Sequence, residues 1–451
     1  MDTSGFDAAT VEAGVGLFMV VCFLCLQLAR RRRSVLLLIW PVLIYFCGPA
    51  MTAMFADHPV LGRYVFADSA LSETLIMFAY VAAFYVADRV FNLSEAILTS
   101  FSSPEIRRLA RSPIFLLIYI PVAIVTVILQ VKILHDLGSA LTGGQYAMEA
   151  AAEGLIPYWG FLAGLYEVLF VFVVLFLLSE QPSKLLSALV VGLYVLAAIL
   201  RVAGGTRLLL IKELAVILIV FYMRGKIKGR RLAIMAVSVV ILGSAVGLLR
   251  SSGSDLAYSF LGPLYGLIME SGLNALTFNI AYHVQNSGFV ADHAHLLDTL
   301  EFITLSAVPS FLRFGVSQAD LDAISPYNVA LAYGFDTSNP VGGMSGFGTL
   351  CYLGSYPFMA TLALVAVLAC LIRYTPKGAW KHIILLVFCI NAIHFWRDPL
   401  DIAVKDFVQD VVCALVLLYV PNPKKSRASP PVPLAIAEAV RVTPLPSKIL
   451  T

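Results

Sequence analysis

Gly204-Gly205-Thr206-Arg207 separates two apolar runs, residues 185–202 and 208–223, and the second run ends in Arg224-Gly225-Lys226-Ile227-Lys228-Gly229-Arg230-Arg231. Basic residues gather at the cytoplasmic ends of membrane-spanning helices. The basic stretch therefore predicts a cytoplasmic turn, and the Gly-Gly-Thr-Arg turn is predicted on the opposite, extracytoplasmic side. A guanidinium group at a helix start on that side is well suited to bind an anion.

The composition of the whole chain agrees with a membrane location. Of the 451 residues, 60% are hydrophobic and only 13% are charged, and the mean hydropathy is +0.88. A soluble protein of this length could not bury so much apolar surface. The composition therefore predicts an all-α polytopic membrane protein, surrounded by membrane lipids and without a nucleic-acid partner.

About eleven apolar runs approach the ~20 residues that a helix needs to cross a bilayer. The first run precedes Arg30-Arg31-Arg32-Arg33, the reverse of the charge order in a cleavable signal peptide, so the N-terminus is predicted outside and the C-terminus inside. The predicted cytoplasmic segments hold 22 of the 31 lysines and arginines, in keeping with the positive-inside rule. The predicted spans are residues 11–28, 35–55, 71–90, 114–133, 158–178, 185–202, 208–223, 232–249, 350–372, 382–395 and 402–420.

Four regions follow from this topology. Residues 1–249 contain the first eight spans, residues 250–349 form a large periplasmic loop with amphipathic helices, and residues 350–421 contain the last three spans. Residues 422–451 are rich in proline and polar side chains and are predicted to be a disordered cytoplasmic tail. Within the loop, residues 257–284 are predicted to be an amphipathic helix on the membrane surface, with a re-entrant or spanning helix as the alternative.

Three groups of residues are candidates for chemistry on the outer face. The first is the turn before the seventh span, in which Thr206 is the predicted N-cap and Gly205 and Arg207 flank it. Backbone N–H groups, the helix dipole and a guanidinium that can grip phosphate oxygens in bidentate fashion would then converge on one place. The alternative is an interfacial arginine that reaches to lipid headgroups.

The second group is Arg397-Asp398-Pro399-Leu400-Asp401, between the last two predicted spans. Aspartate followed by proline predicts a helix start, with Asp398 as N-cap and Pro399 at the first helical position. Asp401 and Lys405 are four residues apart and are predicted on one helix face, with Lys405 directed toward a cavity because a charge inside a membrane is costly. The alternative is a structural charge pair that closes the hairpin.

The third group lies in the long loop. Glu270 stands in an otherwise apolar segment, where a carboxylate is suited to act as a general base, although a plain solvent-facing glutamate is the alternative. Asp292, Glu301, Arg250 and Arg313 are further candidates in or beside the loop. Asp292-His293-Ala294-His295 is better explained as a polar surface stretch than as a metal site, and neither a metal nor a cofactor is expected.

Charged residues also fall inside predicted spans. Glu73, Glu167, Lys212 and Glu213 are each predicted to line the protein interior. Lys212 and Glu213 are neighbours in sequence and point in different directions on a helix, so they are not expected to be each other's partner.

Together these features resemble the Wzy-type polymerases that join the repeat units of bacterial O-antigens and exopolysaccharides. The resemblance rests on Gly205-Thr206-Arg207 before a span with a basic exit, on the large outer loop and on Arg397-Asp398. The proline-marked segment 302–312 and the glycine-rich segment 339–348 add to it. It covers roughly residues 190–420 as a pattern of spacing, and it departs from the family where Thr349 follows Gly348 in place of a glutamate.

The resemblance implies a GT-C-like glycosyltransferase of the bacterial inner membrane, with its site at the periplasmic face. The implied substrate is a polyprenyl-pyrophosphate-linked oligosaccharide, and a flippase and a chain-length regulator are implied as candidate partner proteins. Arg207, helped by Arg397 or Arg250, would stabilise the leaving pyrophosphate, and Glu270 or a carboxylate between Asp292 and Glu301 would accept the proton of the attacking hydroxyl.

Two alternatives to the polymerase remain open. An O-antigen ligase uses the same donor but transfers the glycan to lipid A core. A flippase or exporter of the same lipid-linked sugar belongs to a different class, in which charged residues often lie across the membrane midplane.

The predicted topology can be tested by labelling. Cysteines introduced in place of Ser254 and Ser317 are expected to react with a membrane-impermeant thiol reagent in intact spheroplasts, because residues 250–349 are predicted outside. The parent protein, with its seven native cysteines, is the control for background labelling. Labelling that requires cell lysis would overturn the topology.

Overall fold

The computed structural model describes 13 helices and a few residues around them, and every regular element in that part of the chain is a helix. Several helices are described by their backbone, with only some of their side chains. The described residues are 19–20, 23, 36–45, 67–103, 106, 113–138, 154–179, 184–203, 207–250, 276–278, 280–281, 283–284, 296–308, 313, 315–325, 379–397 and 400–419.

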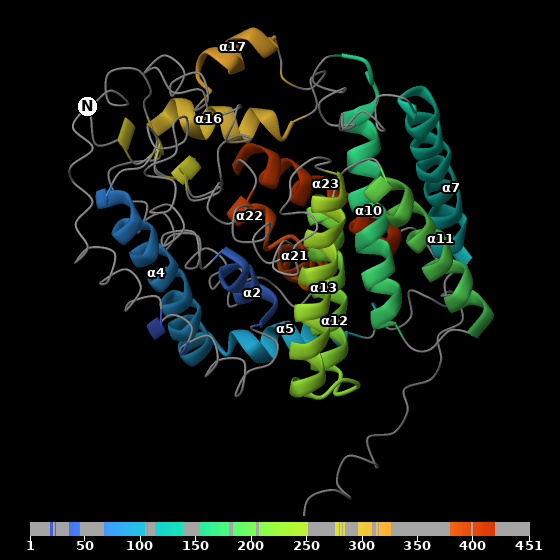
Figure 1. Ribbon diagram of the computed structural model, residues 1–451, viewed down its shortest axis with the longest axis horizontal. Coiled ribbons are helices and arrows are strands. Elements are labelled where there is room, and N and C mark those ends of the chain that lie inside the picture. Colours follow the sequence, from blue (N-terminus) through green and yellow to red (C-terminus); the bar gives the residue numbers. More distant parts are fainter. Residues whose placement is uncertain are drawn as a thin grey trace, which may run out of the picture.

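Several of the predicted apolar runs form single helices (Figure 1), whereas predicted span 382–395 is divided into two helices by a turn at residues 391–393. Runs 114–133, 158–178, 185–202, 208–223 and 232–249 each coincide with one helix. The bounds are α2 Leu36–Tyr45, α4 Ala67–Phe91, α5 Leu93–Phe101, α7 Pro113–Asp136, α10 Trp159–Leu178, α11 Lys184–Ala203, α12 Arg207–Met223, α13 Gly229–Arg250, α16 Leu296–Ser306, α17 Gln318–Ala323, α21 Ala379–Ile390, α22 His394–Arg397 and α23 Leu400–Tyr419.

Three helices in the described part are long and apolar enough to cross a membrane. They are Ile114–Asp136 of α7, Trp159–Leu178 of α10 and Lys184–Ala203 of α11. A bilayer core is about 30 Å thick, and a helix rises about 1.5 Å per residue, so about 20 apolar residues suffice. This property indicates a membrane protein. The predicted span 350–372 lies outside the described residues.

Helix α10 occupies the centre of this group. It packs against α7, α11, α12 and α23. In its most apolar window 78% of the residues are buried, against 28% for both α7 and α11. A helix that is apolar on all sides is stable in a protein core or in a membrane, and α10 meets the first condition because other helices surround it. Phe170, Phe172 and Phe176 of α10 are among the largest fully buried side chains.

The outer faces of α7 and α11 remain apolar where no other described helix covers them. Leu117 of α7 is 73% exposed, and Leu185 and Ile199 of α11 are 83% and 60% exposed. Exposure of such faces to water is unfavourable, whereas contact with lipid chains is not, because lipid chains are as apolar as leucine itself. The two helices are therefore suited to face lipid on one side and α10 on the other.

The predicted basic turn joins α12 and α13, which run side by side (Figure 1). Gly225 in this turn has a φ of +70°, a conformation that a side chain would disfavour. Arg224 donates hydrogen bonds to the carbonyl oxygens of Leu177, at 2.8 Å, and of Leu178. These carbonyls end α10 and lack partners within the helix, so Arg224 caps α10 and ties the hairpin to the central helix.

The described end of segment 257–284 differs from the predicted surface helix. Leu276, Thr277, Phe278, Ile280 and Val284 are all buried, and the apolar ones belong to the main core together with α10. A helix on the membrane surface would keep one polar face exposed. This end of the segment instead packs inside the protein.

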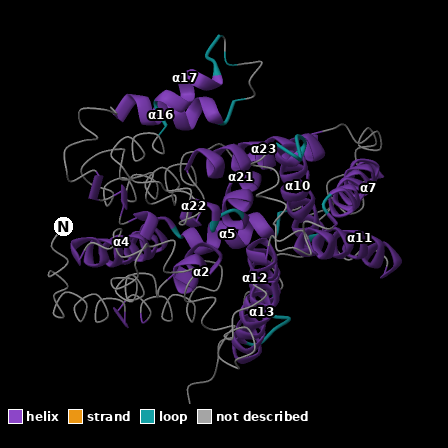
Figure 2. Ribbon diagram, turned by 45° about the horizontal axis from the view of Figure 1, so that its top comes forward, coloured by secondary structure: helices purple, strands orange, loops and turns teal. Residues whose placement is uncertain are grey.

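Helices α16 and α17 lie at one end of the bundle, where α16 packs against α23 (Figures 1 and 2). Phe302, Ile303 and Leu321 form a small core against Leu400 and Val404 of α23. Helix α17 begins with a capping box: the Asp320 N–H donates to Ser317 Oγ, and the Asp320 carboxylate accepts from the Ser317 N–H at 2.8 Å. The Ser317 hydroxyl also donates to Asp320 Oδ2 at 2.6 Å, and this bond, together with the one from the Ser317 N–H, lowers the pKa of Asp320 and gives this carboxylate a structural role.

Candidate functional site

The structure gathers ionisable side chains at the centre of the bundle, around Lys212 and Glu213 of α12. Both side chains are only 1% exposed. They point to different partners, as predicted from their adjacent positions in the helix. The prediction that these residues and Glu167 line the interior is confirmed, because Glu167 is 4% exposed. Glu73 has no described side chain.

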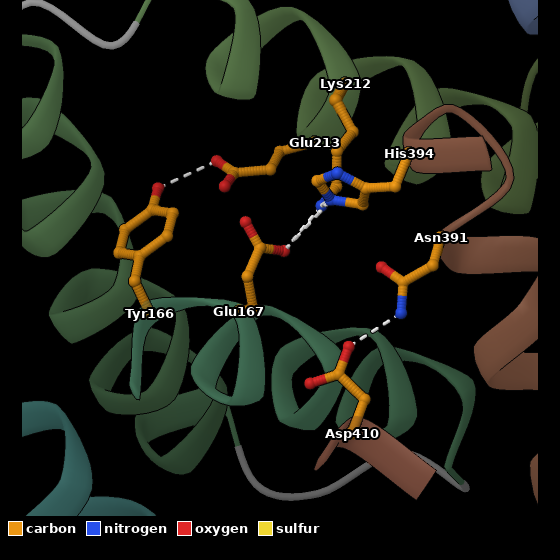
Figure 3. A network of polar contacts seen from close by, with 7 residues as sticks. All are labelled: Tyr166, Glu167, Lys212, Glu213, Asn391, His394 and Asp410. Carbon is orange, nitrogen blue, oxygen red and sulfur yellow. Dashed lines mark hydrogen bonds and ion pairs between the residues drawn. The ribbon is translucent and has the colours of Figure 1, made fainter. Parts of the chain in front are cut away.

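Lys212 contacts two residues from two other helices (Figure 3). Its Nζ lies 2.5 Å from Glu167 Oε2 of α10 and also contacts Nε2 of His394 of α22. His394 Nε2 lies 3.7 Å from the same Glu167 oxygen. One ammonium group therefore joins α10, α12 and α22.

The same ring nitrogen of His394 faces two groups. Nε2 contacts the Lys212 Nζ and lies 3.7 Å from Glu167 Oε2. The tautomer of the imidazole decides whether Nε2 accepts a hydrogen bond from Lys212 or donates one toward Glu167.

Glu213 forms a second part of the site with aromatic residues of α10 and α11. The Tyr166 hydroxyl donates to Glu213 Oε2 at 2.8 Å, and the Tyr166 ring stacks on Tyr194 with centroids 6.0 Å apart. The Arg201 guanidinium lies 4.3 Å from the Tyr166 ring centroid and 6.0 Å from that of Trp159. The tyrosine thus bonds the carboxylate, and the Arg201 cation lies against the aromatic rings beside it.

Asn391 and Asp410 form a third part. Asn391 lies in the turn between α21 and α22, and its Nδ2 donates to Asp410 Oδ2 of α23 at 2.7 Å. Both residues are completely buried. Asp410 interacts electrostatically with Glu167 and Lys212, so this pair belongs to the same network (Figure 3).

The position of the network along the helices relates it to the candidate turns. Lys212 lies five residues after Arg207, the first residue of α12, a helix rise of about 7.5 Å. His394 lies in the same four-residue helix as Arg397. The contact of Lys212 with His394 therefore ties together the helix that begins at Arg207 and the helix that ends at Arg397.

The chemistry available here is that of buried charge. A carboxylate, an ammonium and an imidazole in mutual contact can exchange protons. The cationic side chains of Lys212 and Arg201 can attract an anion. Taking such charges out of water costs several kcal/mol for each ion, so they are retained within membranes mainly where they serve a purpose. Among the described residues, no group of three or more histidine, cysteine and acidic side chains could hold a metal ion.

Most of the site residues predicted from sequence lie at the ends of described helices or beyond them. Arg207 begins α12, Arg250 ends α13 and Arg397 ends α22, and for these three only the backbone is described. Outside the described residues lie Gly205, Thr206, Glu270 and Asp292.

The two predicted loop residues with described side chains differ in their surroundings. Glu301 is exposed on α16, and Arg313 is half-buried, with its Nε donating to the carbonyl oxygen of Val308 at 2.9 Å.

Lys405 of α23 is exposed, so it does not face an interior cavity as predicted. A lysine so near the start of the helix can reach the interface with its long chain.

Other members of the network carry little sequence signal. Tyr166 and Tyr194 are aromatic residues in apolar helices and resemble ordinary core. Arg201 stands at the end of a span, where an interfacial arginine is common. His394 and Asp410 offer a clearer signal, because each is an ionisable residue inside an apolar run.

In comparisons with known proteins, no family model, curated sequence or solved structure matches the chain.

The Lys212–Glu167 pair can be tested by a double-mutant cycle. Glu167→Gln and Lys212→Met are each expected to lower the free energy of unfolding by about 3–5 kcal/mol, because each leaves a buried charge without its partner. The double variant is expected to lose clearly less stability than the sum of the two single losses. Unfolding of the purified protein in mixed detergent micelles measures these values.

The matched control for this cycle is Lys184→Met, which removes an exposed lysine at the start of α11. Surface substitutions of this kind change stability little. Strictly additive effects of Glu167→Gln and Lys212→Met would contradict the pairing.

Proposed function

We propose that this protein is a repeat-unit polymerase of the Wzy type, a GT-C-like glycosyltransferase with about eleven spans in a bacterial inner membrane. It would join polyprenyl-pyrophosphate-linked oligosaccharides at the periplasmic face. The proposal is carried by the contact of Lys212 with His394, because this contact links the two helix ends that bear Arg207 and Arg397. Two arginines at neighbouring helix ends suit a pyrophosphate, which offers several anionic oxygens.

The proposed reaction divides the work between the arginines and a carboxylate. A sugar hydroxyl of one lipid-linked unit attacks the anomeric carbon of another, and the bond from that carbon to the pyrophosphate oxygen breaks. Arg207, with Arg397 or Arg250, would stabilise the negative charge that develops on the polyprenyl pyrophosphate. Glu270, Asp292 or Glu301 would accept the hydroxyl proton, and the exposure of Glu301 leaves it accessible to a substrate.

A second candidate function has support from the buried network. Ionisable residues within a membrane often line the path of a transported substrate. Glu167, Lys212, Glu213 and Asp410 are buried on three helices of the bundle. These buried charges therefore favour a flippase or exporter of lipid-linked sugar as the alternative function.

Deletion of the gene distinguishes the candidates through the surface glycans of the cell. A polymerase deletion leaves single repeat units on the surface. A ligase deletion leaves uncapped lipid A core while polymer accumulates on its lipid carrier. Loss of all repeat units from the periplasmic face would indicate a flippase and contradict the polymerase.

Substitution of Arg207 tests its role directly. Arg207→Lys is expected to lose much of the polymerising activity, and Arg207→Ala about a hundredfold to a thousandfold, because the point charge of lysine cannot match two oxygens at once. Polymer length and the rate of chain extension in membranes measure this loss. Glu270→Gln is expected to be similarly severe if Glu270 is the base.

The matched control is Arg230→Ala, which removes an exposed arginine from the opposite, basic end of the same hairpin. Both arginine variants should accumulate in the membrane like the parent protein. Near-normal polymer with Arg207→Ala would leave Arg207 as a membrane anchor and exclude it from the site.

A further inference from the structure

Asp410 is a buried carboxylate of the network that forms no ion pair with any cationic side chain among the described residues. It is completely buried on α23, and the hydrogen bond that its side chain makes within that part of the chain is the 2.7 Å contact from the neutral amide of Asn391. A neutral donor stabilises a carboxylate but does not neutralise its charge. An uncompensated charge at such a position costs several kcal/mol.

The pair also has unused acceptors. Asp410 Oδ1 and Asn391 Oδ1 are both buried, and neither has a hydrogen-bond partner among the residues that the structure describes. Buried oxygens of this kind are rare, because the great majority of buried polar atoms are satisfied. The free oxygen of the Asp410 carboxylate lies on the side away from Asn391 (Figure 3), where it can accept a proton or a cation.

The surrounding charges do not offset this carboxylate. Lys212 is already paired with Glu167, and Asp406, one turn before Asp410 on α23, adds a further negative charge. His394 contacts the same Lys212. Besides His394, the network holds three buried carboxylates, Glu167, Glu213 and Asp410, and two other basic side chains, Lys212 and Arg201.

The other elements around α23 do not change this balance. Helix α21 contributes a buried thiol, Cys389, and a half-buried imidazole, His382, whose Nδ1 lies 2.9 Å from Ser100 Oγ on α5. Cys413 of α23 itself also interacts with Asp410. The charged side chains described on α7 and α16 are exposed to the outside, namely Lys132, His135, Asp136 and Glu301.

We propose that Asp410 and Asn391 form a binding site for a small monovalent cation, either a proton or a sodium ion. The cation would bind to the free oxygen of the Asp410 carboxylate, which the Asn391 amide holds in place, and would offset the charge of that carboxylate. Sodium prefers such oxygen ligands, and a proton would bind directly to the carboxylate. This inference does not depend on the proposed polymerase activity, and it gives the protein a second ligand.

The test is the thermal stability of the purified full-length protein, because a ligand that binds only the folded state raises its Tm. One series replaces choline chloride by sodium chloride at constant ionic strength and alkaline pH. The other lowers the pH stepwise in the absence of sodium. A rise of a few degrees in the first series identifies sodium, and a rise only in the second identifies a proton.

Asp410→Asn is expected to abolish whichever rise the parent protein shows, since the amide carries no charge. Asp136→Asn, which changes an exposed aspartate of α7 in the same way, is the matched control and should keep the rise. A parent protein that is insensitive in both series would overturn the proposal. A dependence that persists in Asp410→Asn, or that disappears in Asp136→Asn alone, would do the same.

Asn391→Ala keeps the carboxylate and covers the case in which Asp410→Asn fails to accumulate. Loss of the amide that donates to the Asp410 carboxylate should shift the midpoint of the cation dependence relative to the parent protein. An unchanged midpoint would remove Asn391 from the site and contradict the proposal. Because the readout is stability, these results are independent of the surface-glycan experiments.

Discussion

The contact of Lys212 with Glu167 and His394 is the constraint on which the centre of the structure depends. Each of these groups would be unfavourable alone in a membrane interior, so their helices must come together for any of them to be buried. The three residues come from α10, α12 and α22. A single ionic cluster therefore fixes how the central helix meets two segments that are far away in the sequence.

Apolar packing accounts for the frame around this cluster and could be predicted from the sequence. Residues 114–133, 158–178 and 185–202 are long uninterrupted apolar runs, and α7, α10 and α11 follow them. Helix α12 begins at Arg207, directly after the two glycines and the threonine that predict its start. Hydropathy does not show which helix is central, because α7, α10 and α11 are similarly apolar, while only α10 is mostly buried.

The candidate site was less accessible to prediction for a physical reason. An ionisable residue inside an apolar run indicates a buried charge, and this signal identified Glu167, Lys212 and Glu213. The partner of each charge depends on packing between distant segments: His394 lies 182 residues from Lys212. The same limit applies to residues 276–284, whose apolar spacing fits a surface helix but whose apolar side chains join the main core.

The two proposals meet on α23. This helix carries Asp410 within the bundle, and its first turns hold Leu400 and Val404 against Phe302 and Ile303 of α16. A cation at Asp410 would change the charge beside Glu167 and Lys212, and hence the balance that holds α12 and α22 together. Because α16 packs against the same helix, a displacement of α23 would also move α16, which contains Glu301. Cation binding would act on the proposed site through such packing contacts, since Asp410 itself is completely buried.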